Sequence, residues 1–160
     1  MPATYEPIAK YTVSSSQSSY TFSSIPSTYT DLIIIVSGTS SSDISYRLQF
    51  NSDTGSNYSF TYLYGDGSSA TSGRQTNQAF IGGMARTGTT QGNGIIHIMN
   101  YSNTTTYKTA IGTGGTAAVL IIENVGTWRS TSAINSMTLI TESGTVSTGS
   151  TFTLYGIKAA

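Results

Sequence analysis

Three side chains that carry oxygen ligands stand close together in residues 50–60, FNSDTGSNYSF. Asn51, Asp53 and Asn57 lie two to four residues apart around Gly55, a spacing similar to that of the oxygen ligands in a calcium loop. Such a loop needs several carboxylates and a distal bidentate glutamate, whereas this one has a single carboxylate. Asx residues beside a glycine are also what a tight turn requires. A turn is therefore the first interpretation, with a contact surface for a neighbour or glycan, or a weak metal site, as alternatives.

Aromatic side chains follow this loop at alternate positions. Tyr58, Tyr62 and Tyr64 alternate with Phe60 along the chain, so in a strand their rings would gather on one rim. Tyrosine offers a large, rigid and amphipathic contact area, which suits a polar contact surface or carbohydrate stacking. Ordinary cross-strand aromatic pairing is the structural alternative. The candidate contact or glycan surface thus comprises Asn51, Asp53, Asn57, Tyr58, Tyr62 and Tyr64.

Residues that could perform catalysis are few. His97 is the only histidine, it has large neighbours at alternate positions, and no G-x-S-x-G motif supplies a nucleophile for it. The seven carboxylates include no pair marked out for glycoside hydrolysis. The glycine-rich residues 112–115 precede a β-branched run rather than a helix, which favours a turn over a phosphate site. We therefore expect no enzyme activity, no metal site and no cofactor.

The composition limits the classes of partner. Only 9% of the 160 residues are charged, against roughly a quarter in typical proteins, and the formal net charge is +0. Serine and threonine make up about a third of the chain, and there is no cysteine. A neutral surface without a basic patch attracts neither nucleic acid nor anionic membranes. We expect neither as a partner.

The elements that must position these side chains are strands. Residues 43–50, DISYRLQF, alternate apolar and polar side chains, which predicts a strand with one buried face. Residues 31–38 and 118–125 are almost continuously apolar, which predicts strands covered on both faces, with a neighbour or loop on the second face. Further strands are expected at residues 10–13, 20–23, 60–64, 78–84, 95–101, 107–111, 136–141 and 151–157.

About ten short strands separated by turn residues predict an all-β fold. An antiparallel β-sandwich of the jelly-roll type is expected, because helical periodicity and fixed-period repeats are both absent from the sequence. Residues 11–160 are expected to form this single domain. Residues 1–10, with Pro2 and Pro7, are expected to form an extended amino-terminal arm in which Tyr5 and Ile8 could make contacts.

Three blocks of the sequence resemble a known group of proteins. They are TFSSIPSTYTDLIIIVSG (residues 21–38), LQFNSDTGSNYS (residues 48–59) and SGTVSTGSTFTLYGIK (residues 143–158). Together they resemble small, Ser/Thr-rich β-sandwich virion proteins of tailed bacteriophages. Similar blocks occur in head decoration proteins and in tail or fibre proteins. The blocks are scaffold segments, so the resemblance carries no functional residues with it.

The resemblance implies a structural protein of the virion, assembled in the host cytoplasm. The first expectation is a capsid decoration or cement protein that forms a homo-oligomer, with a trimer favoured, and binds the major capsid protein or other virion proteins. The alternative is a tail or tail-fibre module that binds a host-surface glycan. A secreted carbohydrate-binding module outside any virus is a more distant third.

Overall fold

The computed structural model describes residues 4–158, and in this range every regular element is a β-strand. The strands are β1 (Tyr5–Thr12), β2 (Ser19–Phe22), β3 (Asp31–Gly38), β4 (Ile44–Phe50), β5 (Tyr58–Gly65), β6 (Ala70–Gln78), β7 (Arg86–Thr87), β8 (Gly92–Met99), β9 (Lys108–Thr116), β10 (Leu120–Trp128), β11 (Met137–Thr141) and β12 (Thr151–Ile157). The described part of the chain contains no helix long and apolar enough to cross a membrane.

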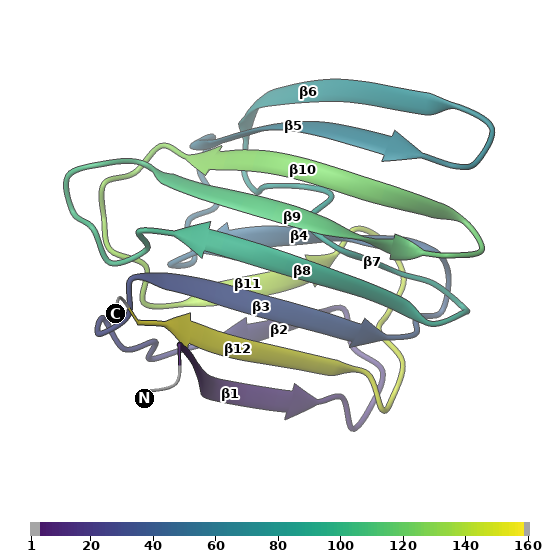
Figure 1. The fold of residues 1–160 in the computed structure, drawn as a ribbon, viewed down its shortest axis with the longest axis horizontal. Helices are drawn as coiled ribbons and strands as arrows, with labels where there is room; N and C mark the ends of the chain where they lie inside the picture. The colour runs from purple at the N-terminus through teal and green to yellow at the C-terminus, as the bar shows by residue number, and fades with distance from the viewer. Residues whose placement is uncertain (1–3, 159–160) are drawn as a thin grey trace.

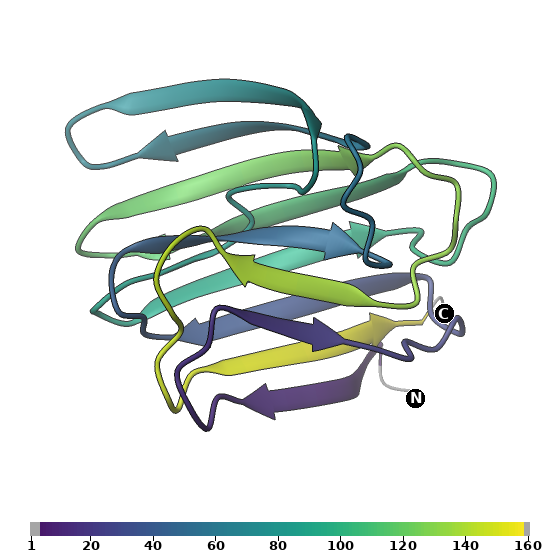
Figure 2. The same ribbon diagram turned by 180° about the vertical axis from the view of Figure 1, so that it is seen from behind.

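The strands form two antiparallel sheets that pack face to face, as Figures 1 and 2 show from opposite sides. The large sheet has eight strands in the order β1-β12-β3-β8-β9-β10-β5-β6. The small sheet has four, in the order β2-β11-β4-β7. The predicted antiparallel β-sandwich is therefore confirmed.

The pairing order is that of a jelly roll. A jelly roll places eight strands in two four-stranded sheets as two Greek keys. Here β1 pairs with β12 and β3 with β8 in one sheet, while β2 pairs with β11 and β4 with β7 in the other. The pairs β12–β3 and β11–β4 complete the two four-stranded units.

Two additional hairpins extend one sheet only. The β5–β6 hairpin lies in sequence between β4 and β7, and the β9–β10 hairpin lies between β8 and β11. Both add to the β8 edge of the large sheet, through the pairs β8–β9, β10–β9, β10–β5 and β5–β6. The small sheet ends at β7, so the far strands of the large sheet extend beyond it (Figure 1).

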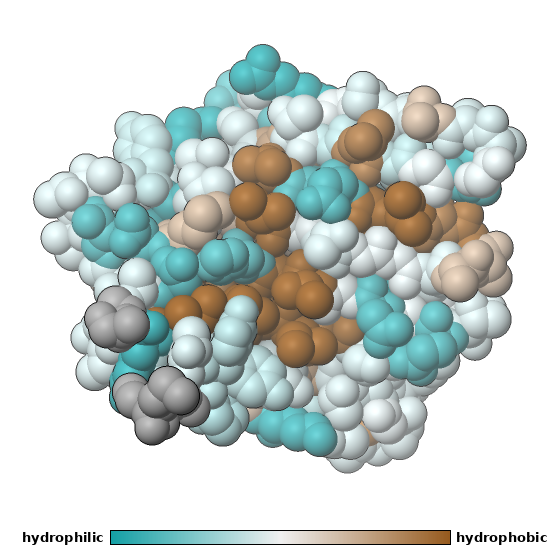
Figure 3. Space-filling view, viewed as in Figure 1, coloured by the Kyte–Doolittle hydropathy of each residue, from teal (hydrophilic) through white to brown (hydrophobic). Residues whose placement is uncertain are grey.

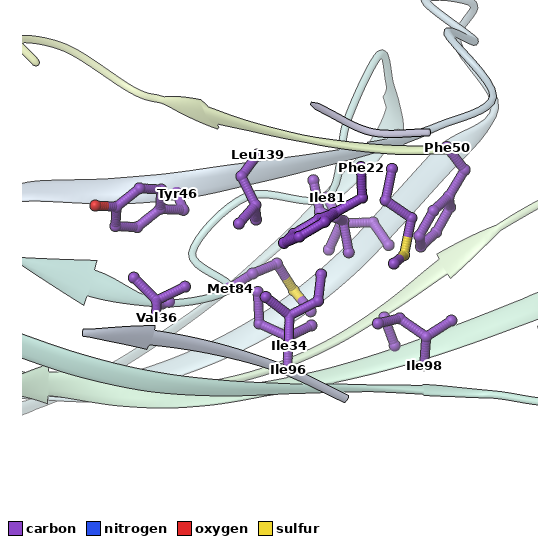
Figure 4. Close-up of a cluster of buried hydrophobic side chains, with 14 of the residues drawn as sticks. Phe22, Ile34, Val36, Tyr46, Phe50, Ile81, Met84, Ile96, Ile98 and Leu139 are labelled. Carbon is purple, nitrogen blue, oxygen red and sulfur yellow. The ribbon is translucent and has the colours of Figure 1, made fainter. Parts of the chain in front are cut away.

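The core lies between the sheets and is built by alternation along each strand. In β4, Ile44, Tyr46, Leu48 and Phe50 are all buried, as the sequence pattern predicts. They meet side chains from β3 and β8, including Ile34, Val36, Ile96 and Ile98 (Figure 4). The Tyr46 hydroxyl shares a hydrogen bond with Thr87, yet its burial dominates and raises its pKa to about 12.

The prediction of a separate amino-terminal arm at residues 1–10 is wrong for the residues that the structure describes. Residues 1–3 lie outside the described residues. Tyr5–Thr12 pair with β12, so this segment is the edge strand of the large sheet. Ile8 packs against the core, whereas Tyr5 is exposed. Pro7 is tolerated because it lies in an edge strand, next to the irregularity in register between Pro7 and Ala9.

Candidate functional site

The loop after β4 is a turn held together by its own polar side chains. Asp53 accepts hydrogen bonds from the Gly55 amide at 2.8 Å, from Asn57 Nδ2 at 2.9 Å and from Trp128 Nε1 at 2.6 Å. Burial on its own would raise the pKa of this carboxyl, but the hydrogen bonds from Trp128, Asn57 and Gly55 outweigh burial and lower it. The carboxylate is therefore stabilised in its charged form by the protein's own donors.

Asn51 holds a second loop in place. It adopts a left-handed backbone conformation (φ 51°), which asparagine tolerates better than most residues. Its side-chain oxygen accepts hydrogen bonds from the amides of Asn135 and Ser136, and its Nδ2 donates to the Ala133 carbonyl at 2.8 Å. The amide side chain is thus occupied on both sides. Among the candidates in this loop, only Asn57 has an exposed side chain, and it is bonded to Asp53.

These contacts favour the turn interpretation over a metal site. Within residues 4–158, no group of three or more His, Asp or Glu side chains is close enough to hold a metal ion. Calcium sites of modest affinity bind in the millimolar range. We expect calcium at about 10 mM, or EDTA, to leave the melting temperature of the protein unchanged. Differential scanning calorimetry checks this, and a rise of several degrees with calcium alone would restore the metal interpretation.

Tyr58 does not belong to a contact surface. It is fully buried, its ring packs beside Phe50 and Trp128, and its hydroxyl donates to the Asp53 carbonyl at 3.1 Å. Burial raises its pKa to about 12. The expectation that Tyr58 shares an exposed rim with the other tyrosines is therefore wrong, because the second sheet covers this end of β5.

Tyr62 and Tyr64 are the candidates that remain accessible. They lie on the inner side of β5, beyond the edge of the small sheet, and their rings stack with centroids 6.1 Å apart. They line a groove of about 540 Å³ between the extension of the large sheet and the edge of the small sheet. Its lining residues are Ser45, Arg47, Phe60, Tyr62, Tyr64, Gln75, Gln78, Phe80, Gly82, Gly83, Arg86, Leu120, Ile122 and Glu142.

The sequence gives no signal for most of this groove. Arg47 belongs to β4, Gln75 to β6, Arg86 to β7, and Glu142 directly follows β11. Only the topology brings these four together, because the β5–β6 hairpin folds over the edge of the other sheet. The alternation of aromatic residues along β5 was the one sequence pattern that indicated part of the groove.

The outer face of the large sheet is a second candidate surface, and the sequence did not predict it. Odd-numbered residues of β3, β5, β8, β9 and β10 point away from the core. Several are aliphatic and strongly exposed: Ile121 is 69% exposed, Leu63 51%, Ile95 48%, Val125 48% and Ile35 36%. The continuous apolar runs were expected to be covered on both faces. The chain itself leaves this face uncovered.

These side chains form a band across neighbouring strands. Ile35 lies opposite Ile95 in the β3–β8 register, and Val125 lies opposite Ile111 in the β10–β9 register. Figure 3 shows this face, with apolar residues gathered across its centre and toward one side. A hollow of about 430 Å³ lies at one end of the band, lined by Leu63 and Ile121 among others. We call Ile33, Ile35, Ile95, Ile111, Ile121, Val125 and Leu63 the outer band.

The lone histidine lies beside the outer band. His97 Nε2 is 3.0 Å from an Asp31 carboxylate oxygen, and the other Asp31 oxygen accepts a hydrogen bond from the Asn100 amide. His97 lies opposite Ile33 in the β3–β8 register. The pair links the ends of β3 and β8 on the outer face, in keeping with the interpretation of His97 as a strand histidine.

No family model matches the chain, and none of the curated proteins is similar to it in sequence. The function must therefore be argued from the two surfaces described above.

Proposed function

We propose that the protein is a non-catalytic structural component of a tailed-bacteriophage particle, and that it works by association through the outer band. The observation that carries the proposal is the outer band itself: five exposed and two half-buried aliphatic side chains on one continuous sheet face. Contiguous apolar patches of this kind mark interaction surfaces in soluble proteins. The resemblance of three sequence blocks to β-sandwich virion proteins supports the particle context.

The size of the face suits a stable interface. Eight strands about 4.8 Å apart, each about eight residues long at about 3.3 Å per residue, span roughly 1,000 Å². A standard protein interface buries about 800 Å² on each partner. The outer face of the large sheet is therefore large enough to be covered by one partner without help from any other surface.

The occupant that we propose is another copy of the same chain. A face that meets its own kind must not place like charges opposite each other. Here the histidine carries its own carboxylate partner, and the row that contains Ile35, Ile95 and Leu63 holds two charged residues of opposite sign, Lys10 and Glu123. Such a face can pack on a copy of itself at little electrostatic cost. A face packed on its own copy makes a two-fold contact, so the trimer expected from the sequence stays a prediction that would need a different contact.

Within the particle, a head decoration or cement role is the proposal, with the major capsid protein as the second partner. An interface repeated many times over a symmetric shell benefits from having few ions to desolvate. The 9% of charged residues accords with that requirement. The low charge and the aliphatic outer band thus support the same mode of action, which is burial rather than catalysis.

The number of copies in each purified particle tests this role. Quantitative mass spectrometry of intact particles should find the chain at a stoichiometry comparable to that of the major capsid protein. A few copies per particle would place the protein in the tail and contradict the decoration role. Its absence from purified particles would contradict the structural proposal as a whole.

A further inference from the structure

The residues that line the groove beside the β5–β6 hairpin have no part in the proposed association through the outer band. It exists because the inserted hairpin extends the large sheet beyond β7, the last strand of the small sheet. One wall therefore comes from the inner face of β5 and β6, and the other from β4, β7 and the residue after β11. It faces away from the outer band, so the two surfaces can act independently.

The β5 wall is an aromatic platform. Phe60, Tyr62 and Tyr64 occupy alternate positions on the inner side of β5. The rings of Tyr62 and Tyr64 are 6.1 Å apart and within 15° of parallel. Tyr62 lies across from Gly73 in β6, where a Cβ atom would come within 2.4 Å of the tyrosine hydroxyl. The glycine thus leaves the space in which the Tyr62 ring lies.

The opposite wall supplies hydrogen-bond donors. Arg86 is half-buried and donates from Nη1 to Ser45 Oγ at 3.2 Å, while its buried Nε has no hydrogen-bond partner. Arg47 lies over the Phe80 ring at 4.2 Å and pairs with Glu142 at 3.6 Å. Gln75 and Gln78 add amides from β6, on the same wall as the tyrosines. The Arg86 guanidinium therefore retains donors that no described residue uses.

The charge of the groove is positive. Its lining contains two guanidinium groups, Arg47 and Arg86, and one carboxylate, Glu142, which leaves one positive charge. Within residues 4–158 Arg86 makes no salt bridge. A planar guanidinium with free donors is suited to binding a carboxylate. Flat aromatic surfaces beside convergent polar groups are typical of ligand sites, and they match a ring that has one apolar face and hydroxyls at its edge.

We propose that this groove binds an acidic saccharide, with a sugar ring against Tyr62 and Tyr64 and the sugar carboxylate on Arg86. The side-chain amides of Gln75 and Gln78 then form hydrogen bonds with the hydroxyls of the sugar ring. The proposal goes beyond the structural role and does not depend on it. It also relocates the glycan surface expected from the sequence, since it retains Tyr62 and Tyr64 but excludes Asn51, Asp53, Asn57 and Tyr58.

The test uses the full chain on an array that carries carboxylated oligosaccharides and their neutral counterparts. Binding should be confined to carboxylated sugars. For the strongest binder, isothermal titration calorimetry should give an affinity at least about tenfold lower for Tyr64→Ala and for Arg86→Gln, as expected at hot-spot positions. Gln75→Ala, an exposed strand position, provides a variant with little risk to folding and should also bind more weakly.

The matched controls are Tyr107→Ala and Arg74→Gln, which remove an exposed tyrosine and an exposed arginine outside the groove. Both should bind within about twofold of the original chain. The proposal is overturned if the array gives no signal above that of a blank, or if neutral counterparts bind equally well. It is also overturned if folded Tyr64, Arg86 and Gln75 variants all retain full affinity.

Discussion

Replacing Ile95 and Ile121 together by lysine should convert the oligomer that we propose into a 16.8 kDa monomer. Both side chains belong to the outer band, at 48% and 69% exposure, so neither replacement opens a cavity in the core. A lysine ammonium buried in an interface without a partner costs several kcal/mol, and a symmetric contact incurs that cost on each chain. Light scattering coupled to size exclusion measures the result directly.

A lysine on the other sheet provides the control. Thr21 is an exposed β-branched residue of β2, so Thr21→Lys adds a lysine charge, one against the two of the double variant, to a strand without touching the outer band. It should leave the oligomer intact. The melting temperatures of all three proteins should remain within a few degrees of each other, because the substituted side chains are exposed. A double variant that keeps the oligomer mass would exclude the outer band as the interface.

Replacing Asp53 by alanine should lower the free energy of unfolding by about 3 kcal/mol at neutral pH. The change removes the carboxylate that accepts hydrogen bonds from the Trp128 indole N–H, the Gly55 amide and the Asn57 side chain. Trp128 is only 3% exposed. A buried donor left without a partner costs more than the hydrogen bond itself contributes. Urea denaturation of the two proteins checks the loss.

The pH dependence gives the same prediction a second readout. The folded pKa of Asp53 lies below its unfolded value, so its stabilising effect is complete above the unfolded value of about 3.9 and is lost as pH falls through the folded pKa. The stability difference between the original chain and Asp53→Ala should therefore shrink below about pH 4. Asp43→Ala, at another exposed turn, should change the free energy of unfolding at neutral pH by no more than about 0.5 kcal/mol. An Asp53 variant as stable as the original would mean that the turn does not need its carboxylate.

Much of the fold could be predicted from the sequence because apolar alternation and uninterrupted apolar runs survive in the strands of the core. The expected bounds of residues 31–38 and 151–157 match β3 and β12. The strands of the two added hairpins could be predicted less well. Residues 70–78 form β6 but are almost entirely polar, because this edge strand has little core to cover, and of these residues only Gln78 falls in a strand expected from the sequence.

Two other differences have the same origin in local composition. Residues 78–84 were expected to be a strand, yet most of this segment is an irregular crossing, which places the Ile81 and Met84 side chains in the core. Residues 112–115 were expected to be a turn but continue β9. A Cβ atom on Gly112 would lie 2.4 Å from the Met84 carbonyl oxygen, so glycine there permits a close approach of two backbones rather than a turn.

The candidate site could be predicted only in part, because it depends on contacts between distant strands. Alternation on β5 correctly places Tyr62 and Tyr64 on one face, but it cannot tell that the second sheet covers Tyr58 and stops short of the other two. Likewise, nothing in the sequence near Arg86 indicates that it lines the same groove as those rings. Four residues of the outer band (Ile33, Ile35, Ile121 and Val125) lie in the apolar runs 31–38 and 118–125, but the runs alone could not show which side of each strand stays uncovered.

Sedimentation of the original chain at about 0.05 M and about 1 M sodium chloride tests self-association through the outer band most directly. The two conditions change the Debye length several-fold. Association through an aliphatic face with few ions predicts a mass that is a multiple of 16.8 kDa and is the same at both salt concentrations. A monomer at micromolar concentration in both conditions, or an oligomer that dissociates as salt rises, would contradict it.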